Sequence, residues 1–526
     1  MHFPCFRRGR AYSSAVFVCA MAGVTWLASP PLAVRSATSA NVDWPSFNND
    51  VTSNRYASPN VINTANVGTL RTVCSVSLGA AQRFESGPIV VAGVMYVTTL
   101  DHTFALNAAT CAALWTTTYT LPPNSGGSNH GAAYASGRVF RGFVDAHVAA
   151  LNATTGAPLW NTNVRSSLPS GSTEYIVGAP IVAKNSVFIG TAGGENGQIC
   201  HVVAIDQATG RVLWVTASIP SPNSTWKGAT RMAGGATWSS MTFDPVAGKL
   251  YVPVGNPAPD FDIRQRAGSN LYTDAVLELD PSTGALDRAI QLDAQDDHDW
   301  DMAATPAIVT LAGGTKVALA AGKDGYLRSI DFGTFHQRWQ TPVTTILNAT
   351  APITPSGTHF CPGKGGVFWN GPAYSPATGL AYVNAVDWCS TVDLSPTPQP
   401  YVPGQSWLGS SNSYGTPDAT KSGWLYAVNA TTGVKKWSYH AATPLVAAVT
   451  PTAGGLVFTA DLAGNVFAFD AAKGTLLKTI PTGQPVGGGI VSYEVSGKQY
   501  VAVAAGMYST VFGTKQVNPS IVVLGL

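Results

Sequence analysis

The sequence has few charged side chains: Asp, Glu, Lys and Arg make up 11% of its 526 residues, and the formal net charge is only +2. A balance this close to neutral provides no electrostatic basis for binding nucleic acid or an anionic membrane surface. Beyond residue 40 the sequence also lacks any apolar run long enough to cross a bilayer. We therefore expect no nucleic-acid partner and no membrane span in the mature chain.

A Cys-x-x-Cys-His motif is also missing, which excludes a covalently attached c-type haem on this chain. Segment 1–40 instead has the pattern of a secretory signal peptide. A basic start with Arg7, Arg8 and Arg10 is followed by the apolar run 15–27 and by small residues suited to cleavage. A membrane anchor is the alternative, but the run is short and two prolines follow it. We predict cleavage and export to the periplasm or the medium.

What the sequence does contain is a repeated unit: a hydrophobic strand, an Asp or Asn, a turn that typically ends in Thr-Gly, and a second strand often opening on Trp. Copies occur at 104–115, 148–160, 202–214, 276–286, 425–437 and 466–477. Each copy follows another pair of short β-type runs, so one repeat holds about four strands and no convincing helix. This pattern indicates an all-β propeller, in which each repeat forms one blade.

Eight starts of inner strands can be counted, near residues 88, 132, 180, 239, 306, 372, 451 and 487. Their even spacing predicts an eight-bladed propeller over a single domain, residues 41–526. The last strand, 521–524, has no outer partner in its own repeat, and residues 70–78 have the apolar alternation to supply one. We predict that the N- and C-terminal strands pair and close the ring, which removes an exposed sheet edge.

Five cysteines remain after cleavage of the signal: Cys74, Cys111, Cys200, Cys361 and Cys389. Export favours disulfides, and an odd number leaves one thiol unpaired. Cys361 and Cys389 bracket one inner-strand pair, and Cys111 is a candidate neighbour of Cys74 across the ring closure. The sequence alone does not fix the connectivity.

Several short motifs between Glu195 and Lys323 do not follow the repeat pattern. Glu195 lies in a Gly-rich turn and Asn256 in a Gly-Asn-Pro turn, and their carboxylate and amide oxygens are hard donors that suit Ca²⁺. Taken alone, Asn256 is better explained as a turn residue before proline. When Glu195 and the other motifs are considered together with it, Asn256 is better explained as a calcium ligand.

The word at 297–301, Asp-His-Asp-Trp-Asp, places three carboxylates within five residues, which is unusual crowding for a solvated loop. A carboxylate beside a bound dication can stay ionised and accept a proton from an alcohol, which is the work of a general base. Trp238 offers a π-face on which a planar ligand can stack, although a buried core tryptophan is an equal alternative without further context.

The chain resembles the quinoprotein alcohol dehydrogenases, eight-bladed propellers that carry pyrroloquinoline quinone (PQQ), and within them the polyvinyl-alcohol-dehydrogenase-like branch. The words that carry the resemblance are Trp44, Asn54-Arg55-Tyr56, Asn66-Val67, the segment 85–88 and the closing segment 487–506. The resemblance extends over essentially the whole mature chain. It implies blades built from PQQ-type repeats.

The resemblance also implies roles for residues in the motifs between Glu195 and Lys323. Glu195 and Asn256 correspond to the family's two protein ligands for calcium. Asp301, aligned on its Trp-Asp pair, corresponds to the catalytic base. Asp297 and Asp299 lie in the same segment but do not align with the base, so they are internal controls for that assignment.

Four further positions correspond to contacts of the cofactor. Trp238 matches the tryptophan that forms the floor beneath PQQ, and Lys323 matches the basic residue that donates hydrogen bonds to the quinone oxygens. Glu85 occupies the position of a glutamate that lines the cofactor pocket. His130 stands where an arginine normally meets a cofactor carboxylate.

Other positions depart from the family pattern. They replace two adjacent cysteines, two hydroxyl residues, an asparagine and a substrate-pocket tryptophan, and they are Asn124-Ser125, Val177, Ala192, Phe368 and Asp260. In lanthanide-dependent relatives a further Asp stands two positions after the base, where this chain has Ala303. The missing anion favours calcium.

Two functions remain open at this point. The first is PQQ- and calcium-dependent oxidation of a small or polymeric alcohol to the carbonyl compound, with electrons passing to a separate acceptor such as a cytochrome c. The second is a cofactor-free propeller used for binding or assembly in the cell envelope. The joint presence of Glu195, Asn256, Asp301, Trp238 and Lys323 favours the first, since a scaffold has no need of a carboxylate cluster. The replaced cofactor contacts favour the second.

Overall fold

The computed structural model describes residues 41–123 and 125–526, so the predicted signal segment lies outside the described residues. The described residues fall within one compact unit, Ser39–Leu526. Their helical content is limited to four short 3₁₀ helices: η1 (Val67–Thr69), η2 (Val164–Ser167), η3 (Gly194–Asn196) and η4 (Ile263–Gln265). Everything else that is regular is β-strand, as the repeats predict.

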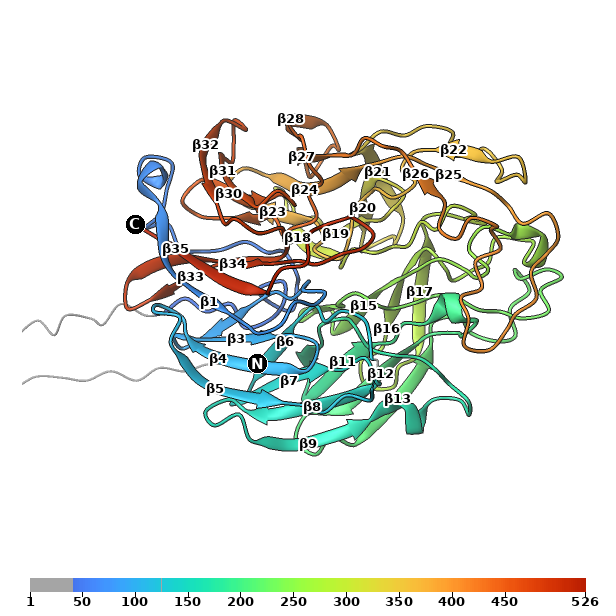
Figure 1. The fold of residues 1–526 in the computed structure, drawn as a ribbon, viewed down its shortest axis with the longest axis horizontal. Coiled ribbons are helices and arrows are strands. Elements are labelled where there is room, and N and C mark those ends of the chain that lie inside the picture. The colour runs from blue at the N-terminus through green and yellow to red at the C-terminus, as the bar shows by residue number, and fades with distance from the viewer. Residues whose placement is uncertain (1–40, 124) are drawn as a thin grey trace, which may run out of the picture. The chain divides into compact units, whose positions relative to one another are not determined.

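The strands of the described residues form eight four-stranded antiparallel sheets and one smaller sheet (Figure 1). The first four blades are β2 (Ile89–Val91), β3 (Val94–Thr98), β4 (His102–Asn107) and β5 (Ala113–Thr118); β6 (Ala132–Ala135), β7 (Arg138–Gly142), β8 (His147–Asn152) and β9 (Pro158–Asn163); β10 (Ile181–Ala183), β11 (Ser186–Gly190), β12 (His201–Asp206) and β13 (Val212–Ala217); and β14 (Thr242–Asp244), β15 (Lys249–Val254), β16 (Ala275–Leu279) and β17 (Leu286–Gln291).

The other four blades are β18 (Ala307–Thr310), β19 (Lys316–Ala321), β20 (Tyr326–Asp331) and β21 (Gln337–Pro342); β23 (Ala373–Ser375), β24 (Leu380–Asp387), β27 (Ser422–Asn429) and β28 (Lys435–Ala441); β29 (Thr450–Pro451), β30 (Leu456–Ala460), β31 (Asn465–Asp470) and β32 (Leu476–Pro481); and β33 (Val486–Val495), β34 (Lys498–Ala505), β35 (Ser520–Gly525) and β1 (Arg71–Ser77). The eight first strands begin within three residues of the predicted starts, and the largest offset is at β14.

The blades follow one another around a ring. The innermost strands contact each other in the order β2, β6, β10, β14, β18, β23, β29 and β33. The amide of Gly489 in β33 then donates a 3.1 Å hydrogen bond to the carbonyl of Ser86, just before β2, which returns the series to the first blade. The fold is therefore an eight-bladed β-propeller.

The pairing of the chain ends is confirmed. Strand β1 pairs antiparallel with β35, with Val76 opposite Ile521, and so completes the eighth blade from the N-terminal side. A disulfide between Cys74 in β1 and Cys111 in the first repeat turn fastens this blade to the first. This pair is one that the sequence left open, and among the residues that the structure describes Cys200 is the buried free thiol.

The repeat motif has a local physical reason. The side-chain oxygen of Asn152 accepts hydrogen bonds from the amides of Thr154 and Thr155, which forms the turn. Gly156 ends the turn at φ +73°, and a Cβ there would lie 2.6 Å from the ring of Trp115 in the preceding blade. The indole nitrogen of Trp115 donates to the carbonyl of Ala153 at 3.1 Å. Each such Trp thus docks on the next turn and links neighbouring blades.

The ninth sheet is not anticipated by the repeats. It consists of β22 (Thr358–Phe360), β25 (Ser390–Val392) and β26 (Thr416–Pro417), which are inserted around the sixth blade, and we call it the side sheet. A disulfide joins Cys361, directly after β22, to Cys389, directly before β25. This staple holds the chain that continues into residues 362–365.

Candidate functional site

All seven residues predicted to form the site lie in loops at one end of the blades. In an antiparallel sheet, the start of the first strand and the end of the second strand lie at the same end. Glu85, His130, Trp238 and Asp301 precede first strands, while Glu195, Asn256 and Lys323 follow second strands. The ring then brings these loops together, although they are far apart in the sequence.

Glycines let three of these loops pack backbone against backbone. A Cβ on Gly194, next to Glu195, would lie 2.8 Å from the Cα of Gly234. A Cβ on Gly234 would in turn lie 2.4 Å from the carbonyl oxygen of Asn256. The glycines at 194 and 234 therefore allow Glu195 and Asn256 to approach each other closely. Their role is steric and goes beyond backbone flexibility.

The Asp301 carboxylate is at the centre of the site and is almost completely buried. Its Oδ1 accepts a 3.1 Å hydrogen bond from the backbone amide of Asn256, and its Oδ2 lies 2.5 Å from Lys323 Nζ. A side chain on Gly255 would collide with Oδ1 at 1.9 Å, so only glycine fits before Asn256. The structure thus places the predicted base beside one predicted metal ligand and the predicted quinone contact.

Lys323 also contacts a residue whose role the sequence did not reveal. Its Nζ lies 3.0 Å from Asp299 Oδ1, so one ammonium group bridges Asp299 and Asp301. Asp299 therefore shares the partner of the proposed base, although it does not align with that base. The Asp297 carboxylate instead pairs with His298 at 2.7 Å. The resemblance to the family pointed only to the base, Asp301. Nothing in the local sequence indicates that Asp299 also contacts Lys323.

The remaining predicted cofactor contacts are connected through aromatic rings. Lys323 Nζ lies 5.9 Å from the centroid of the Trp238 ring, and Trp238 packs edge to face against His130 at 5.8 Å. His130 stacks on Trp369 at 5.5 Å, and its Nε2 lies 3.3 Å from Glu85 Oε2. A continuous series of contacts thus runs from Glu85 to the carboxylates around Lys323.

Burial raises the pKa values of three carboxyl groups in the site, Glu195, Asp299 and Asp260. Burial, and next the charge of Asp301, raises the pKa of Glu195 to about 7. Burial raises the pKa of Asp299 to about 6 even though Lys323 opposes the shift. Asp260, where the family has a pocket tryptophan, has its pKa raised well above the ordinary value by burial and by the charge of Asp299. Both Asp260 carboxylate oxygens lack a hydrogen-bond partner among the described residues.

A cavity of about 250 Å³ opens over this cluster. Its polar lining includes Glu195, Asp299 and Lys323, and Phe368 contributes an apolar wall. Of the substituted positions, Val177 and Ala192 pack with Trp238 in one apolar cluster, and Asn124 lies outside the described residues. The arrangement combines oxygen donors for a cation, a positioned carboxylate and an aromatic face beside a space for a small molecule.

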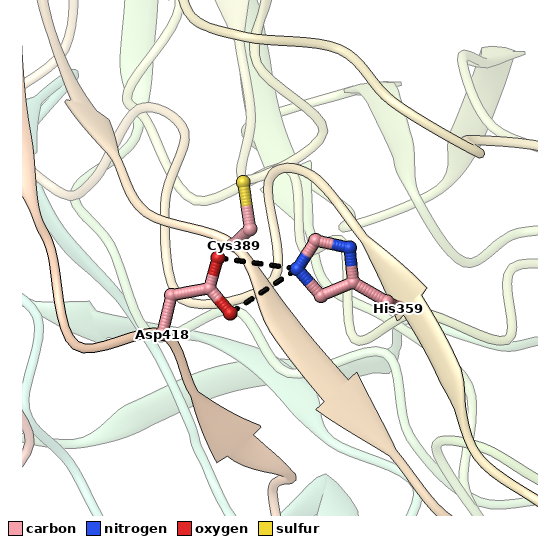
Figure 2. Close-up of side chains that lie close together, drawn as sticks. All are labelled: His359, Cys389 and Asp418. Atoms are coloured by element: carbon pink, nitrogen blue, oxygen red, sulfur yellow. Dashed lines mark hydrogen bonds and ion pairs between the residues drawn. The ribbon is translucent and has the colours of Figure 1, made fainter.

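A second group of metal-ligand types lies on the side sheet, where His359, Cys389 and Asp418 come together (Figure 2). His359 Nε2 is 3.1 Å from both carboxylate oxygens of Asp418. The Cys389 sulfur, however, is bonded to Cys361 and offers no thiolate. This group therefore fastens β22 to the chain after β26 and is not a metal centre.

Comparison with protein families gives two matches. The PQQ family, described as the β-propeller domain of glucose, ethanol and alcohol dehydrogenases, matches residues 44–334. The family of the outer membrane protein assembly factor BamB matches residues 421–513. The first match covers the blades that carry most of the site, and the second covers only repeats of the last blades.

Individual proteins agree with the first match. The dehydrogenase subunit of the alcohol dehydrogenase (quinone) of Gluconacetobacter polyoxogenes is 31% identical over 532 residues, which cover 88% of this chain and 71% of that protein. The crystal structure of quinohemoprotein alcohol dehydrogenase from Comamonas testosteroni is 26% identical with a TM-score of 0.81, covering 92% of this chain and 80% of that chain. A europium-containing methanol dehydrogenase is 25% identical with a TM-score of 0.80, covering 92% and 98% respectively.

Proposed function

This chain belongs to the PQQ-dependent alcohol dehydrogenase family, and from that premise we propose which of its residues carry the oxidation of an alcohol. The dehydrogenase family matches residues 44–334, and a relative of 31% identity is matched over 88% of this chain. The alternative, a cofactor-free assembly protein, has in its favour the match over residues 421–513 and the replaced cofactor contacts. The chain is therefore a PQQ-dependent alcohol dehydrogenase.

The residues present fit a planar, anionic cofactor and a cation. Two buried nitrogens beside the Trp238 ring, His130 Nδ1 and Trp369 Nε1, have no hydrogen-bond partner among the described residues. Buried polar atoms without partners are costly, so a ligand that supplies acceptors would relieve them. Trp238 and Lys323 would hold the quinone, with Glu85 and His130 farther along, and the oxygens of Glu195 and Asn256 would hold the metal.

In this proposal the Asp301 carboxylate takes the hydroxyl proton of the bound alcohol. The observation that carries the assignment is its position: the carboxylate is buried, held by the Asn256 amide at 3.1 Å and by Lys323 at 2.5 Å, and Lys323 in turn lines the cavity. When bound, the quinone supplies the acceptor for the hydride of the alcohol carbon and the metal supplies a Lewis acid. Lys323 would donate hydrogen bonds to the quinone oxygens and stabilise negative charge there.

For the metal we propose calcium. Oxygen donors from a carboxylate and an amide suit a hard cation, and Ala303 leaves the position two residues after the base without a further anion. One similar structure is named as a europium-containing enzyme, so the choice of ion needs a direct measurement. Titration of metal-free protein with Ca²⁺ and with La³⁺ in parallel makes that comparison.

For the location we propose export with cleavage of segment 1–40, followed by transfer of electrons to an external acceptor such as a cytochrome c. The proposal rests on the signal-like pattern of that segment and on the need to reoxidise the cofactor. Among the described residues, no helix has the length and apolar character to span a membrane. Mass spectrometry of the N-terminus of the secreted protein checks the cleavage.

The direct test of the function is reconstitution. Purified apo-protein is incubated with PQQ and Ca²⁺, and dye-linked oxidation of a panel of primary, secondary and polymeric alcohols is followed. Turnover that requires both additions is expected. A protein that binds neither PQQ nor metal would instead favour the scaffold function.

A further inference from the structure

The outer wall of the cavity comes from the side sheet and not from the repeats. Lys364 lies four residues after β22 and Tyr414 two residues before β26, and both line the cavity together with Glu195, Asp299 and Lys323. The Cys361–Cys389 disulfide and the His359–Asp418 ion pair fasten the side sheet beside these two residues. Figure 2 shows the ion pair. The wall is therefore a stapled structure and not a loose loop.

Lys364 differs from the other ammonium group in the cavity. Lys323 is engaged by two carboxylates at 2.5 and 3.0 Å. Lys364 makes no ion pair or side-chain hydrogen bond with the described residues, and its recorded partner is the ring of Tyr414, at 5.0 Å from Nζ to the centroid. Tyr414 is 37% exposed, and its hydroxyl makes no side-chain hydrogen bond with the described residues either. Two side chains with donor groups thus line the cavity without an acceptor among these residues.

Lys364 brings an ammonium group without a paired carboxylate to this wall. Burial lowers the pKa of Lys364 to about 8, although the negative charges of Asp299 and Asp260 oppose the shift. A metal ion at Glu195 would offset negative charge on the cavity floor and weaken the attraction of the floor for Lys364. An ammonium group that is partly desolvated, next to a phenol, forms strong charge-assisted hydrogen bonds with a carboxylate.

Building on the proposed function, we propose that Lys364, assisted by Tyr414, binds a carboxylate of the substrate, so that the enzyme prefers short hydroxycarboxylates to neutral alcohols of the same length. The volume is consistent with a small substrate, because the cavity of about 250 Å³ lies below the usual range for pockets that enclose drug-sized ligands, and the quinone at Lys323 would occupy part of it. The hydroxyl would lie at the Lys323 end, where Asp301 pairs with that ammonium group, and the carboxylate at the side-sheet end. Specificity is then set by the inserted sheet, and the chemistry by the propeller.

The test compares 4-hydroxybutyrate with 1-butanol in the protein reconstituted with PQQ and Ca²⁺. For Lys364→Met, kcat/KM for 4-hydroxybutyrate is expected to fall about 10- to 100-fold more than kcat/KM for 1-butanol, mainly through KM. Lys364→Arg, which keeps the charge, should recover most of the preference. Lys473→Met, at an exposed lysine in the turn between β31 and β32, is the matched control and should change neither substrate.

Two outcomes overturn the proposal. A wild-type enzyme that oxidises 1-butanol as efficiently as 4-hydroxybutyrate has no carboxylate site. An equal loss for both substrates in Lys364→Met, together with weaker PQQ binding measured by tryptophan fluorescence, would assign Lys364 to a carboxylate of the cofactor instead.

A binding measurement separates this inference from the proposed function. Calorimetric titration with butyrate, which carries the carboxylate but no alcohol, should give binding to wild type and a loss of about tenfold or more in Lys364→Met. If butyrate binds in this way but neither substrate is oxidised, the proposed dehydrogenase activity fails and the carboxylate site stands. If butyrate does not bind to an enzyme that oxidises 1-butanol, the carboxylate site fails and the dehydrogenase stands.

Discussion

Asp301 and Asp299 both contact Lys323, yet the chemistry requires different roles for them. Asp301→Asn keeps the shape of the side chain and the hydrogen bond from the Asn256 amide but removes the basic oxygen, so kcat should fall by roughly 10²- to 10⁴-fold. PQQ and metal binding, followed by the absorbance of the bound cofactor, should persist. Steady-state dye reduction and absorbance spectra measure the two effects.

Asp297→Asn is the control for that experiment, because Asp297 belongs to the same word but pairs with His298. Its turnover should stay within a few-fold of wild type. Asp299→Asn is expected to give an intermediate loss, since it removes one of the two partners of Lys323. If Asp299→Asn abolishes turnover while Asp301→Asn does not, the assignment of the base is incorrect.

The raised pKa of the Glu195 carboxyl group leads us to expect that metal binding depends on pH. With its pKa raised to about 7, the apo-protein keeps a proton on this carboxyl below that pH, and a cation must displace it. The apparent Ca²⁺ affinity should therefore rise about tenfold per pH unit up to about pH 7 and level off above it. Isothermal titration calorimetry in buffers of different ionisation enthalpy measures both the affinity and the released proton.

Glu195→Gln is the matched variant for this prediction. It keeps an oxygen donor but has no titrating group, so Ca²⁺ should bind more weakly and without the acidic decline. A variant that retained the full pH slope would place the linked proton on another group. Chelator treatment of the wild-type holoenzyme should abolish turnover, and added Ca²⁺ should restore it.

At the scale of elements, the two disulfides should have separable effects. Each closes a loop of moderate length, with sequence separations of 28 and 37 residues, so removal of either should lower the free energy of unfolding by about 3 kcal/mol. Only the pair Cys361→Ser/Cys389→Ser should also raise the KM for the substrate, because this bond holds the segment 362–365 that lines the cavity. Denaturant unfolding and steady-state kinetics provide the two measurements.

The pair Cys74→Ser/Cys111→Ser is the control, since it lies at the junction of the eighth and first blades, away from the cavity lining. It should lose stability but keep the wild-type KM at 25 °C. Equal changes of KM in both double variants would contradict a specific role of the side sheet in forming the cavity.

At the scale of the whole molecule, closure depends on the last strand. In the eighth blade β35 lies between β1 and β34, so a chain that ends at Pro519 loses the link between the N-terminal strand and its sheet. The uncovered edge of β34 is then free to pair with other chains. We expect aggregation and loss of a single cooperative thermal transition, measured by size-exclusion chromatography and circular dichroism.

Removal of Leu526 alone is the control for that truncation, because this residue follows β35 and is exposed. The shortened chain should elute and unfold as the full-length protein does. A cooperative, monomeric protein without β35 would mean that the ring does not depend on this pairing.

The sequence by itself determined the blades and allowed the seven site residues to be proposed. The turn chemistry of Asn152 and Gly156, repeated along the chain, specifies four-stranded units, and each unit needs a neighbour to bury its faces. The Gly-rich words mark where backbones approach, as at Gly234. These features depend on residues close together in the chain, so they can be predicted from the sequence.

Only the tertiary structure decided which side chains share one space. Asp299 reaches Lys323 from another loop, Asp260 is buried without a partner, and Lys364 and Tyr414 are brought to the cavity by a sheet that interrupts the repeats. None of these has a local signal, because the contacts join segments far apart in the sequence, such as Glu195 and Tyr414 in the cavity lining, and depend on how the ring closes. Electrostatic coupling depends on distance and burial, and those exist only once the chain is folded.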